Sequence, residues 1–447
     1  MISKVTFHSG LGDVMNSSVF LLPCPLSRII PSVYGKIAIP AAFVITLGLA
    51  RIGYSQTVVQ ADQFVDSVGV NIHLHYTNTL YGSNFPLIES ALQDLGVRHV
   101  RDGIETDTWH TYDNELNTLG NQNIKAIFVS SPSETPAQIK AFEALVPHAL
   151  EGIENPNEYD NAGVSAWASV LKTYAPELKS AATSNGETPY LIGPSLVKPT
   201  SYATLGSVAA SINYGNVHDY PSWRNPGTPG SYGWGFGNYG SIPWALQMEG
   251  VSAPKLGVMA TETGYTNATN TPNYVPESVS AVYMPRLLLQ QYLDGIKRTY
   301  IYELLSSGGE DFGLLRSNGY KKPAFFAASN LLNLLSDPGA SFTTTPFPIT
   351  ITGGNSNVHS ILFEKRNHTY YLAVWVELPR YDGSKGVPGA AVTVSSVPLS
   401  LKLSQSVHSV TLYQWDEEGQ AVPTTVTPSQ TLKVTASDQL SILELVP

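Results

Sequence analysis

The pattern of hydrophobic and polar positions changes once along the chain, near Pro338. Before that point, short apolar runs rich in Val and Ile alternate with amphipathic stretches, which predicts βα units around a parallel sheet. Eight strands are predicted, at residues 68–74, 97–101, 124–129, 149–153, 190–192, 217–218, 256–260 and 299–302. Helices are predicted between them, at residues 86–95, 136–145, 164–174, 279–296 and 322–335. Eight such units match an eight-fold (β/α) barrel, or TIM barrel, of about 250 residues.

After Pro338 the period becomes two, as in residues 369–376, and turns rich in Gly, Pro, Asn and Ser separate the apolar runs. Seven or eight short strands of this kind predict an all-β antiparallel sandwich packed on the barrel. The predicted fold class is therefore α/β, with a (β/α)8 barrel over residues 56–338 and a β-sandwich over residues 339–447. Residues 57–62, just before the barrel, could add one more strand to the sandwich.

Residues 1–55 form a predicted targeting segment. An apolar run of about 14 residues, 37–50, follows Lys36, whereas about 20 residues are needed to span a bilayer. Such a run is typical of a secretory signal, with residues 53–55 as the candidate cleavage site. We therefore expect a secreted or periplasmic protein without stable membrane insertion after processing. A membrane-anchored amino terminus is the alternative, because about 36 residues precede the apolar run.

Composition and charge exclude several classes of protein. The chain has 25 Lys and Arg against 35 Asp and Glu, a formal net charge of −10, and its charged residues make up 13%, where about 25% is usual. Because no basic field is present, nucleic acid is not an expected partner. The one cysteine, Cys24, excludes an internal disulfide and a thiolate metal cluster.

Two glutamates follow strands at the positions where barrel enzymes carry their active sites, the carboxyl ends of the strands. Glu158 follows the fourth predicted strand and Glu262 follows the seventh. A pair of carboxyl groups across a cleft suits the cleavage of a glycosidic bond, because one protonates the leaving oxygen while the other attacks or activates water. Each glutamate alone could equally be a salt-bridge partner or a solvated loop residue.

Around these glutamates the sequence resembles clan A of the glycoside hydrolases, retaining β-glycosidases with a β/α barrel often followed by a β-sandwich. Asn157-Glu158 resembles the Asn-Glu pair after strand four, and Glu262, within Ala-Thr-Glu-Thr-Gly, resembles the nucleophile after strand seven. The resemblance implies Glu158 as acid/base, Glu262 as nucleophile and Asn157 as a donor to the sugar 2-hydroxyl. We expect a monomer that acts on a carbohydrate substrate and needs no cofactor and no metal.

Further positions carry the same resemblance. Arg101, at the end of strand two, resembles the arginine that contacts the nucleophile, and His218-x-Tyr220 after strand six resembles the His-x-Tyr element of the clan. A cation and a phenol beside Glu262 would keep that carboxylate ionised. Clan members commonly carry tryptophan at the end of strand eight, where this chain has Tyr302-Glu303. The family within the clan stays open, since glucuronidase-like, xylosidase-like and β-glucanase-like families share these motifs.

Two other functions remain open. His73-Leu74-His75 ends the first predicted strand, and His-x-His there also begins the binuclear site of metal-dependent amidohydrolases. Alternation along a strand would place both imidazoles on one face, where they either contact metal or sugar or simply pack. The metal site would also need a lysine after strand four, histidines after strands five and six and an aspartate after strand eight, of which only His218 is present. A non-catalytic carbohydrate-binding protein on the same scaffold is the other alternative.

Aromatic side chains predict where a sugar would bind. Trp109 follows strand two, and the glycine-rich residues 220–244 include Trp223, Trp234, Phe236, Tyr239 and Trp244. Sugar rings stack their C–H faces on such side chains. We expect Trp109, Trp223 and Trp234 to belong to a sugar platform, whereas Trp244 opens a helical pattern and is expected to pack. Arg224, in the same segment, is either a partner for a uronate carboxylate or a solvated residue.

Overall fold

The computed structural model describes residues 57–105, 110–182, 189–229 and 241–447. The predicted targeting segment, Cys24 and the candidate sugar-binding residues Trp109 and Trp234 lie outside these ranges. Within the described ranges, no helix combines the length and hydropathy that crossing a membrane requires.

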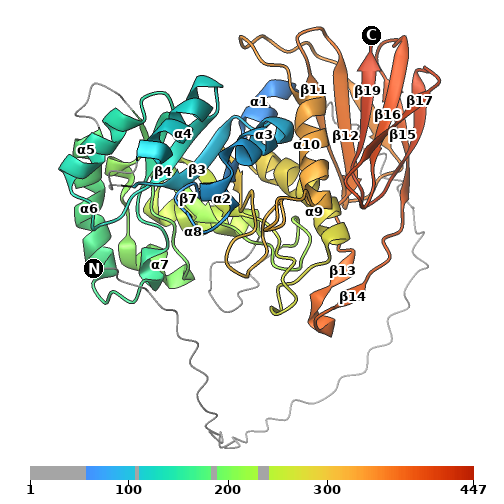
Figure 1. The fold of residues 1–447 in the computed structure, drawn as a ribbon. Coiled ribbons are helices and arrows are strands. Elements are labelled where there is room, and N and C mark those ends of the chain that lie inside the picture. Colours follow the sequence, from blue (N-terminus) through green and yellow to red (C-terminus); the bar gives the residue numbers. More distant parts are fainter. Residues whose placement is uncertain (1–56, 106–109, 183–188, 230–240) are drawn as a thin grey trace, which may run out of the picture. The chain divides into compact units, whose positions relative to one another are not determined.

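Eight parallel strands close into a barrel, which confirms the predicted TIM-barrel fold (Figure 1). Each strand pairs with the next along the chain, and the last pairs with the first through Thr299 and Val68. Most strand residues are buried, as expected for parallel strands covered on both faces. The strands are β2 (Val68–Asn71), β3 (His99–Gly103), β4 (Lys125–Val129), β5 (Leu150–Glu154), β6 (Tyr190–Ile192), β7 (Tyr214–His218), β8 (Gly257–Thr263) and β9 (Thr299–Ile301).

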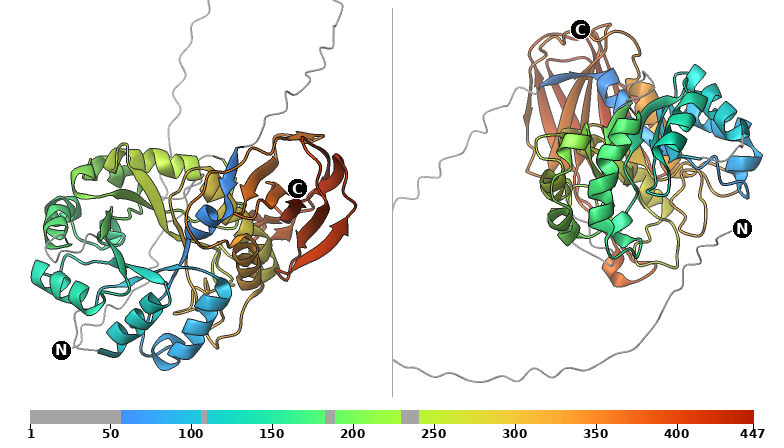
Figure 2. Two further views of the ribbon diagram at one scale, coloured as in Figure 1. Left: turned by 90° about the horizontal axis from the view of Figure 1, so that it is seen from above. Right: turned by 90° about the vertical axis from the view of Figure 1, so that its left-hand side faces the viewer.

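Helices that precede, separate and follow the strands surround the barrel (Figure 2). Local sequence sets their ends: Thr135 and Gln138 form a capping box at the start of α5, and α3 ends at Gly96, whose φ of 82° is left-handed. The helices are α1 (Ala61–Asp66), α2 (Leu80–Ser83), α3 (Phe85–Leu95), α4 (His110–Asn121), α5 (Pro136–Leu145), α6 (Trp167–Ala182), α7 (Pro199–Leu205), α8 (Ile242–Ser252), α9 (Glu277–Leu293) and α10 (Pro323–Leu335).

Several elements differ from the predicted bounds; for example, β7 begins at Tyr214 rather than at residue 217, and β8 runs to Thr263 rather than to residue 260. The first barrel strand ends at Asn71 rather than at residue 74, because the backbone then turns and Tyr76 N–H donates to His73 O. Helix α6 continues through Pro176 to Ala182, past the predicted end at residue 174. Its last turns are held by buried residues such as Leu178, which extend the apolar face of the helix.

The carboxyl-terminal part forms the predicted antiparallel sandwich. One sheet has six strands in the order β1-β11-β12-β19-β16-β17, a second has the order β10-β15-β18, and β13-β14 form a separate hairpin. Strand β1 (Val58–Gln60) comes from before the barrel and pairs in parallel with β11, Val58 opposite Leu362. The others are β10 (Ile349–Thr352), β11 (Val358–Glu364), β12 (Tyr370–Val376), β13 (Tyr381–Asp382), β14 (Ala390–Ala391), β15 (Val397–Leu403), β16 (Ser409–Trp415), β17 (Ala421–Val426), β18 (Thr431–Ala436) and β19 (Ser441–Val446).

Strand β12 is buried on both faces, so the six-stranded sheet is a middle layer. Tyr371 and Trp375 belong to the hydrophobic cluster that also contains residues of α9 and α10. Leu372 and Val374 pack instead with residues of the three-stranded sheet. Because side chains alternate along a strand, one face of β12 contacts barrel helices and the other completes the sandwich.

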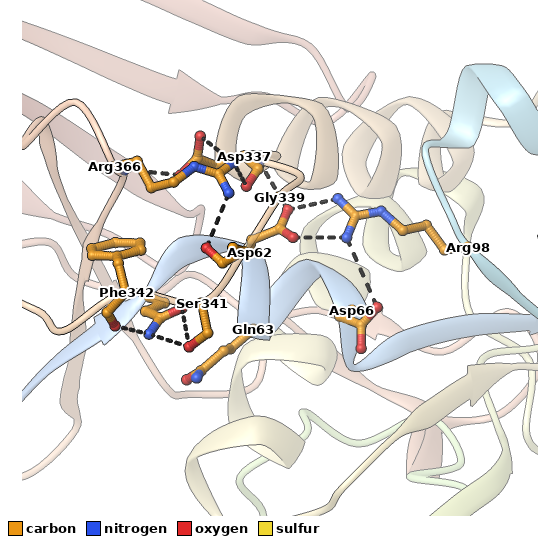
Figure 3. Close-up of a pocket in the computed structure, with 11 residues that line it drawn as sticks. Asp62, Gln63, Asp66, Arg98, Asp337, Gly339, Ser341, Phe342 and Arg366 are labelled. Atoms are coloured by element: carbon orange, nitrogen blue, oxygen red, sulfur yellow. Dashed lines mark hydrogen bonds and ion pairs between the residues drawn. The ribbon is translucent and has the colours of Figure 1, made fainter. Parts of the chain in front are cut away.

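A pocket of about 320 Å³ lies where α1, the start of β3 and the segment after α10 meet (Figure 3). Its charged side chains are paired: Arg98 lies 2.6 Å from Asp62, and Arg366 lies 3.1 Å from Asp337. Asp62 also accepts a hydrogen bond from Asp337 N–H at 2.9 Å. Arg98 precedes β3, so this pocket lies at the amino ends of the strands, away from the end where barrel active sites lie. Arg366 belongs to the sandwich and Asp337 follows α10 of the barrel, so this pair links the two parts.

Candidate active site

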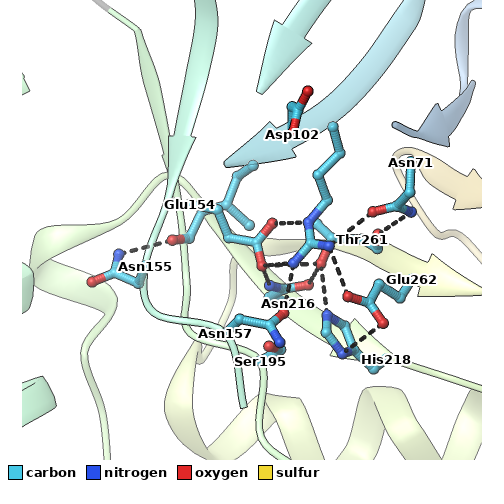
Figure 4. A network of polar contacts seen from close by, with 12 residues as sticks. Asn71, Asp102, Glu154, Asn155, Asn157, Ser195, Asn216, His218, Thr261 and Glu262 are labelled. Carbon is cyan, nitrogen blue, oxygen red and sulfur yellow. Dashed lines mark hydrogen bonds and ion pairs between the residues drawn. The ribbon is translucent and has the colours of Figure 1, made fainter. Parts of the chain in front are cut away.

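Side chains from five strands meet at the carboxyl ends of the barrel strands (Figure 4). The predicted residue Arg101 occupies the centre of this group and is 4% exposed. Its Nε and Nη2 donate to the two oxygens of Glu154 at 2.7 and 2.9 Å, and its Nη1 donates to Glu262 Oε1 at 2.7 Å. The guanidinium therefore bridges the end of β5 and the end of β8.

The remaining contacts of Arg101 complete a buried polar network. Arg101 donates to Asn71 Oδ1 at 2.8 Å and to Asn157 Oδ1 at 2.7 Å. Asn216 Nδ2 donates to Glu154 Oε1 at 3.0 Å. Thr261 Oγ1 lies 2.7 Å from Asn216 Oδ1, so the hydroxyl joins the same network. Every member from Asn71 to Thr261 except the exposed Asn157 is buried, so this network fixes the centre of the barrel mouth.

Sequence reasoning named Arg101 and Asn157 but missed the roles of Asn71, Glu154, Asn216 and Thr261. Of these four residues, only Glu154 could have been found from the sequence, because it is a charged residue that directly follows the apolar residue Ile153 at the end of a predicted strand. A carboxylate that is fully buried needs a cationic or hydrogen-bonding partner, and Glu154 has both.

The two predicted catalytic glutamates face one another across His218. His218 Nδ1 lies 2.8 Å from Glu158 Oε1 and 3.5 Å from Glu262 Oε2. One oxygen of each glutamate and one nitrogen of His218 lie within 4.8 Å of one another. Glu158 has a left-handed φ of 44°, and its N–H donates to Ser195 Oγ at 3.0 Å. The Glu158 side chain is 31% exposed and lies beside His218.

The electrostatic environment of Glu262 favours the carboxylate form. Burial raises the pKa of Glu262, but His218, Arg101 and the hydrogen bond from Tyr220 lower it, and its pKa falls below the usual value. Tyr220 Oη donates to Glu262 Oε2 at 2.7 Å. Burial lowers the pKa of His218, yet Glu262 and Glu158 raise it above the ordinary histidine value. The result is an anion at Glu262 with hydrogen-bond donors on both of its oxygens.

The histidines after the first strand lie at the same mouth, in a different arrangement from the predicted one. They follow the end of β2 in a turn, so alternation along a strand is the wrong reason for their proximity. Their rings are perpendicular with centroids 5.9 Å apart. His75 Nδ1 lies 2.9 Å from Asp102 Oδ1, and His73 Nε2 lies 3.4 Å from Glu303 Oε2. Asp102 thus orients the His75 imidazole through a hydrogen bond, whereas His73 is held by ring contacts with Tyr76 and Tyr302.

Two groups of side chains have the spacing of metal ligands, namely His73 with His75 and Asp102, and Glu158 with His218 and Glu262. In the first group the Asp102 oxygens already accept hydrogen bonds from Leu74 N–H at 3.0 Å and Gly103 N–H at 2.8 Å. These bonds and the bond to His75 account for both carboxylate oxygens without an ion.

Aromatic side chains lie beside Glu262, with Tyr220 in direct contact with its carboxylate. Tyr302 makes edge-on contacts with Tyr220, Phe312 and His73, and His73 stacks on Tyr76 with centroids 4.6 Å apart. These rings give the mouth an apolar wall beside Glu262, the side on which C–H faces of a sugar can pack.

The candidate platform residue Trp223 is engaged by protein on at least one side. Arg224 lies over its ring, 4.4 Å from the centroid, and the backbone at Gly383 of the sandwich approaches its indole closely. Trp244, expected to pack, is partly buried in the first turn of α8 against residues such as Val217. Of the three predicted platform residues, only Trp223 lies within the described ranges, at the boundary between the mouth and the sandwich.

Comparison with solved structures finds similar folds. The structure is similar to that of a family 39 glycoside hydrolase from the gut symbiont Bacteroides cellulosilyticus WH2, with a TM-score of 0.59 and 18% identity over 87% of this chain and 82% of that chain. It is also similar to an arabinofuranosidase, with a TM-score of 0.55 and 11% identity over 87% of this chain and 99% of that chain. No protein-family model and no curated protein sequence matches the chain. These likenesses establish a shared fold.

Proposed function

Starting from a fold shared with glycoside hydrolases, we propose that this protein is a retaining β-glycosidase that hydrolyses β-linked glycans or glycosides by double displacement. Glu262 is the nucleophile and Glu158 the acid/base in this proposal. A carbohydrate substrate, a monomeric state and export by the amino-terminal segment belong to the same proposal.

The observation that carries the proposal is the spacing of the two glutamates. Their nearest carboxylate oxygens lie within 4.8 Å of one another. Retaining enzymes hold their carboxyl groups about 5–5.5 Å apart, whereas inverting enzymes need about 6.5–9.5 Å to admit a water molecule. The short separation supports direct attack of a carboxylate on the anomeric carbon.

The surroundings of the two carboxyl groups suit different roles. Glu262 is 9% exposed and receives hydrogen bonds from Arg101 and Tyr220, so it is held as an anion and aimed at the mouth. Glu158 is more exposed and faces His218 rather than Arg101. In the first step Glu158 donates its proton to the leaving oxygen while Glu262 forms the glycosyl ester. In the second step Glu158 takes a proton from the water that cleaves this ester.

Asn157 and His218 assist these steps. The Asn157 carbonyl oxygen accepts from Arg101, which leaves its Nδ2 as the donor for a sugar hydroxyl beside the bond that breaks. His218 lies between the two glutamates and stabilises negative charge on whichever of them is ionised. His73, His75, Tyr302 and Glu303 line the mouth beside Glu262 and are proposed to contact the sugar or to orient groups that do.

The Arg101→Met variant is expected to lose stability as well as activity. Removing the guanidinium leaves Glu154 buried without its cation, a change that costs about 3–5 kcal/mol. It also removes an effect that lowers the pKa of Glu262, so that pKa rises and the acidic limb of the rate profile moves to higher pH. Thermal unfolding and a pH–rate profile measure the two effects. Arg98→Met, at the other end of the barrel, is the matched control, and an unshifted acidic limb in the Arg101 variant would contradict the contact with the nucleophile.

The Tyr220→Phe variant should act more gently because it keeps the ring and deletes one hydrogen bond to a charged acceptor. The loss is about 1–3 kcal/mol, or about ten- to a hundred-fold in rate, and the acidic limb also moves upward. Steady-state kinetics on an aryl β-glycoside measures it. Tyr413→Phe is the control, because Tyr413 Oη also donates to a carboxylate, that of Glu444, within the sandwich. Equal effects of the two substitutions would show that Tyr220 has no special relation to Glu262.

The proposal is tested by a screen of aryl β-glycosides and β-glycan polysaccharides, with the anomeric configuration of the first product followed by NMR. Retained configuration supports the assignment, whereas inverted product rules out Glu262 as a covalent nucleophile. Binding of a glycan without hydrolysis would favour the non-catalytic carbohydrate-binding alternative. Repeating the screen with EDTA tests the amidohydrolase alternative at His73 and His75, which requires a metal.

A further inference from the structure

The segment that follows Tyr220 connects the active site to the rest of the molecule. Residues 221–228 continue directly from β7 and the His218-x-Tyr220 element. Neighbouring loop residues hold this segment: Ser222 Oγ lies 3.0 Å from Asn273 Oδ1, and Tyr265 Oη donates to Arg224 O at 3.0 Å. Because this segment directly follows Tyr220, its position affects the direction of the Tyr220 side chain.

A sandwich residue, Glu377, binds the same segment. Glu377 directly follows β12, and its Oε1 accepts from Asn225 Nδ2 at 2.7 Å and from Gly227 N–H at 3.0 Å. The close contact between the Glu377 side chain and the backbone at residue 227 requires glycine there, because a Cβ atom would lie 2.3 Å from Glu377 Cγ. Glu377 is thus a direct bridge from the sandwich to the loop that begins at Tyr220.

Other bonds hold the Glu377 carboxylate in a single orientation. Arg286 of α9 donates to its two oxygens at 2.6 and 3.0 Å, and Trp375 Nε1 donates to Oε2 at 2.7 Å. The Arg286 and Glu377 side chains are 0% and 2% exposed. Desolvation of a buried ion pair offsets most of its attraction, so the pair adds little net stability. Its main consequence is geometric, because five donated hydrogen bonds leave Glu377 no other orientation.

We propose that Glu377 is a positioning residue for the active site. By holding Asn225 and Gly227 it fixes the segment after β7, and through it the direction in which Tyr220 Oη meets Glu262 Oε2. The inference rests on the proposed function, in which Glu262 is the nucleophile. Under this proposal, the sandwich is part of the catalytic unit because Glu377 holds the loop that begins at Tyr220.

The test uses Asn225→Ala in the full-length protein, which breaks the side-chain bonds to Glu377 and to Thr228 and leaves the Arg286–Glu377 pair in place, whereas Gly227→Ala disturbs the contact with Glu377 and keeps the bond to Thr228. The matched control is Asn330→Ala, because Asn330 Nδ2 also crosses from the barrel to the sandwich, donating to Gly419 O at 2.8 Å. Both variants should lower Tm by about 2–4 °C. Only Asn225→Ala should lower kcat, by about three- to tenfold on an aryl β-glycoside, with KM within about twofold of wild type. Equal activity losses in the two variants would overturn the proposal.

A double-mutant cycle shows whether the effect passes through Tyr220. If Asn225 acts by positioning the phenol, adding Asn225→Ala to Tyr220→Phe should cause no further loss of kcat. Gly227→Ala, which pushes the segment away from Glu377, should lower kcat as Asn225→Ala does. Added to Tyr220→Phe, it should likewise cause no further loss of kcat. Losses that multiply in the double variants would show that Asn225 acts by another route.

Amide hydrogen exchange separates failure of this inference from failure of the proposed function. If the wild-type protein hydrolysed no β-glycoside, the proposed function would be refuted. Amide hydrogen exchange would still test whether Glu377 holds the segment after β7. Asn225→Ala should speed exchange of residues 214–228 by about tenfold or more, because local opening there becomes easier, and Asn330→Ala should not. Unchanged exchange in residues 214–228 of the Asn225 variant overturns the inference.

Discussion

The Glu262→Gln variant is expected to lose hydrolysis of every β-glycoside by on the order of 10⁴-fold or more. The amide has nearly the volume of the carboxylate but cannot form the glycosyl ester, so one chemical step is removed while the packing remains. The Arg101 charge stays paired with Glu154, so the fold should persist. The ratio kcat/KM on an aryl β-glycoside measures the loss, and circular dichroism with thermal unfolding checks the fold.

Glu89→Gln on α3 provides the control for this substitution, because the same chemical change away from the mouth should leave the rate unchanged. A Glu262→Gln protein with near-normal activity would show that another group attacks the substrate. In the wild type, mass spectrometry of the trapped intermediate should place the sugar on the peptide that contains Glu262.

The Glu158→Ala variant should lose more activity when the leaving group is more basic, because a more basic leaving oxygen depends more strongly on protonation. For alkyl or sugar leaving groups we expect a loss of about 10²–10⁴-fold, and for activated aryl leaving groups a smaller loss in the first step. Azide should restore turnover of activated substrates, because the small anion enters the space left by the side chain and needs no general base. The product should be a β-glycosyl azide, identified by NMR.

The matched control for azide rescue is Glu158→Gln, which removes the acid but fills the space, so azide should not help it. Rescue of both variants, or an α-configured azide, would contradict the assignment of Glu158 as the acid/base of a retaining enzyme. Loss of Glu158 also removes one of the two carboxylates that raise the pKa of His218, so that pKa should fall. A titration of His218 by NMR would detect this shift.

The barrel and the position of the catalytic candidates could be predicted because they depend on short-range pattern. Strands of a parallel barrel are buried on both faces, and their apolar runs therefore stand out in sequence. The residues just after such runs lie at one mouth, which is how Glu158 and Glu262 could be paired before any contact was known. The turn that carries His73 and His75 was missed because one of its N–H groups, that of Leu74, bonds to the side chain of Asp102 from another strand, a contact that local sequence does not show.

The polar network and the link to the sandwich could not be predicted, because both depend on register between distant strands. Asn216 and Thr261 bind Glu154 only because β5, β7 and β8 bring them to one height in the barrel. Asn225 and Glu377 are 152 positions apart and meet through the packing of whole layers. Local hydrophobic periodicity does not predict contacts between residues so far apart in the sequence. A neutral residue such as Asn225 in a proline-rich loop also has no sequence feature that would mark it as a contact residue.

The strand taken from before the barrel has a consequence for self-association. In the six-stranded sheet β11 has β12 on one side and β1 on the other, so β1 occupies what would otherwise be an open edge. An open edge presents unpaired N–H and C=O groups that pair readily with another chain. A chain shortened through Gln60 would uncover β11 along residues 362–364 and gain a site for intermolecular sheet extension. The three residues of β1 thus cover part of the edge of a sheet whose other strands all come from the carboxyl-terminal part of the chain.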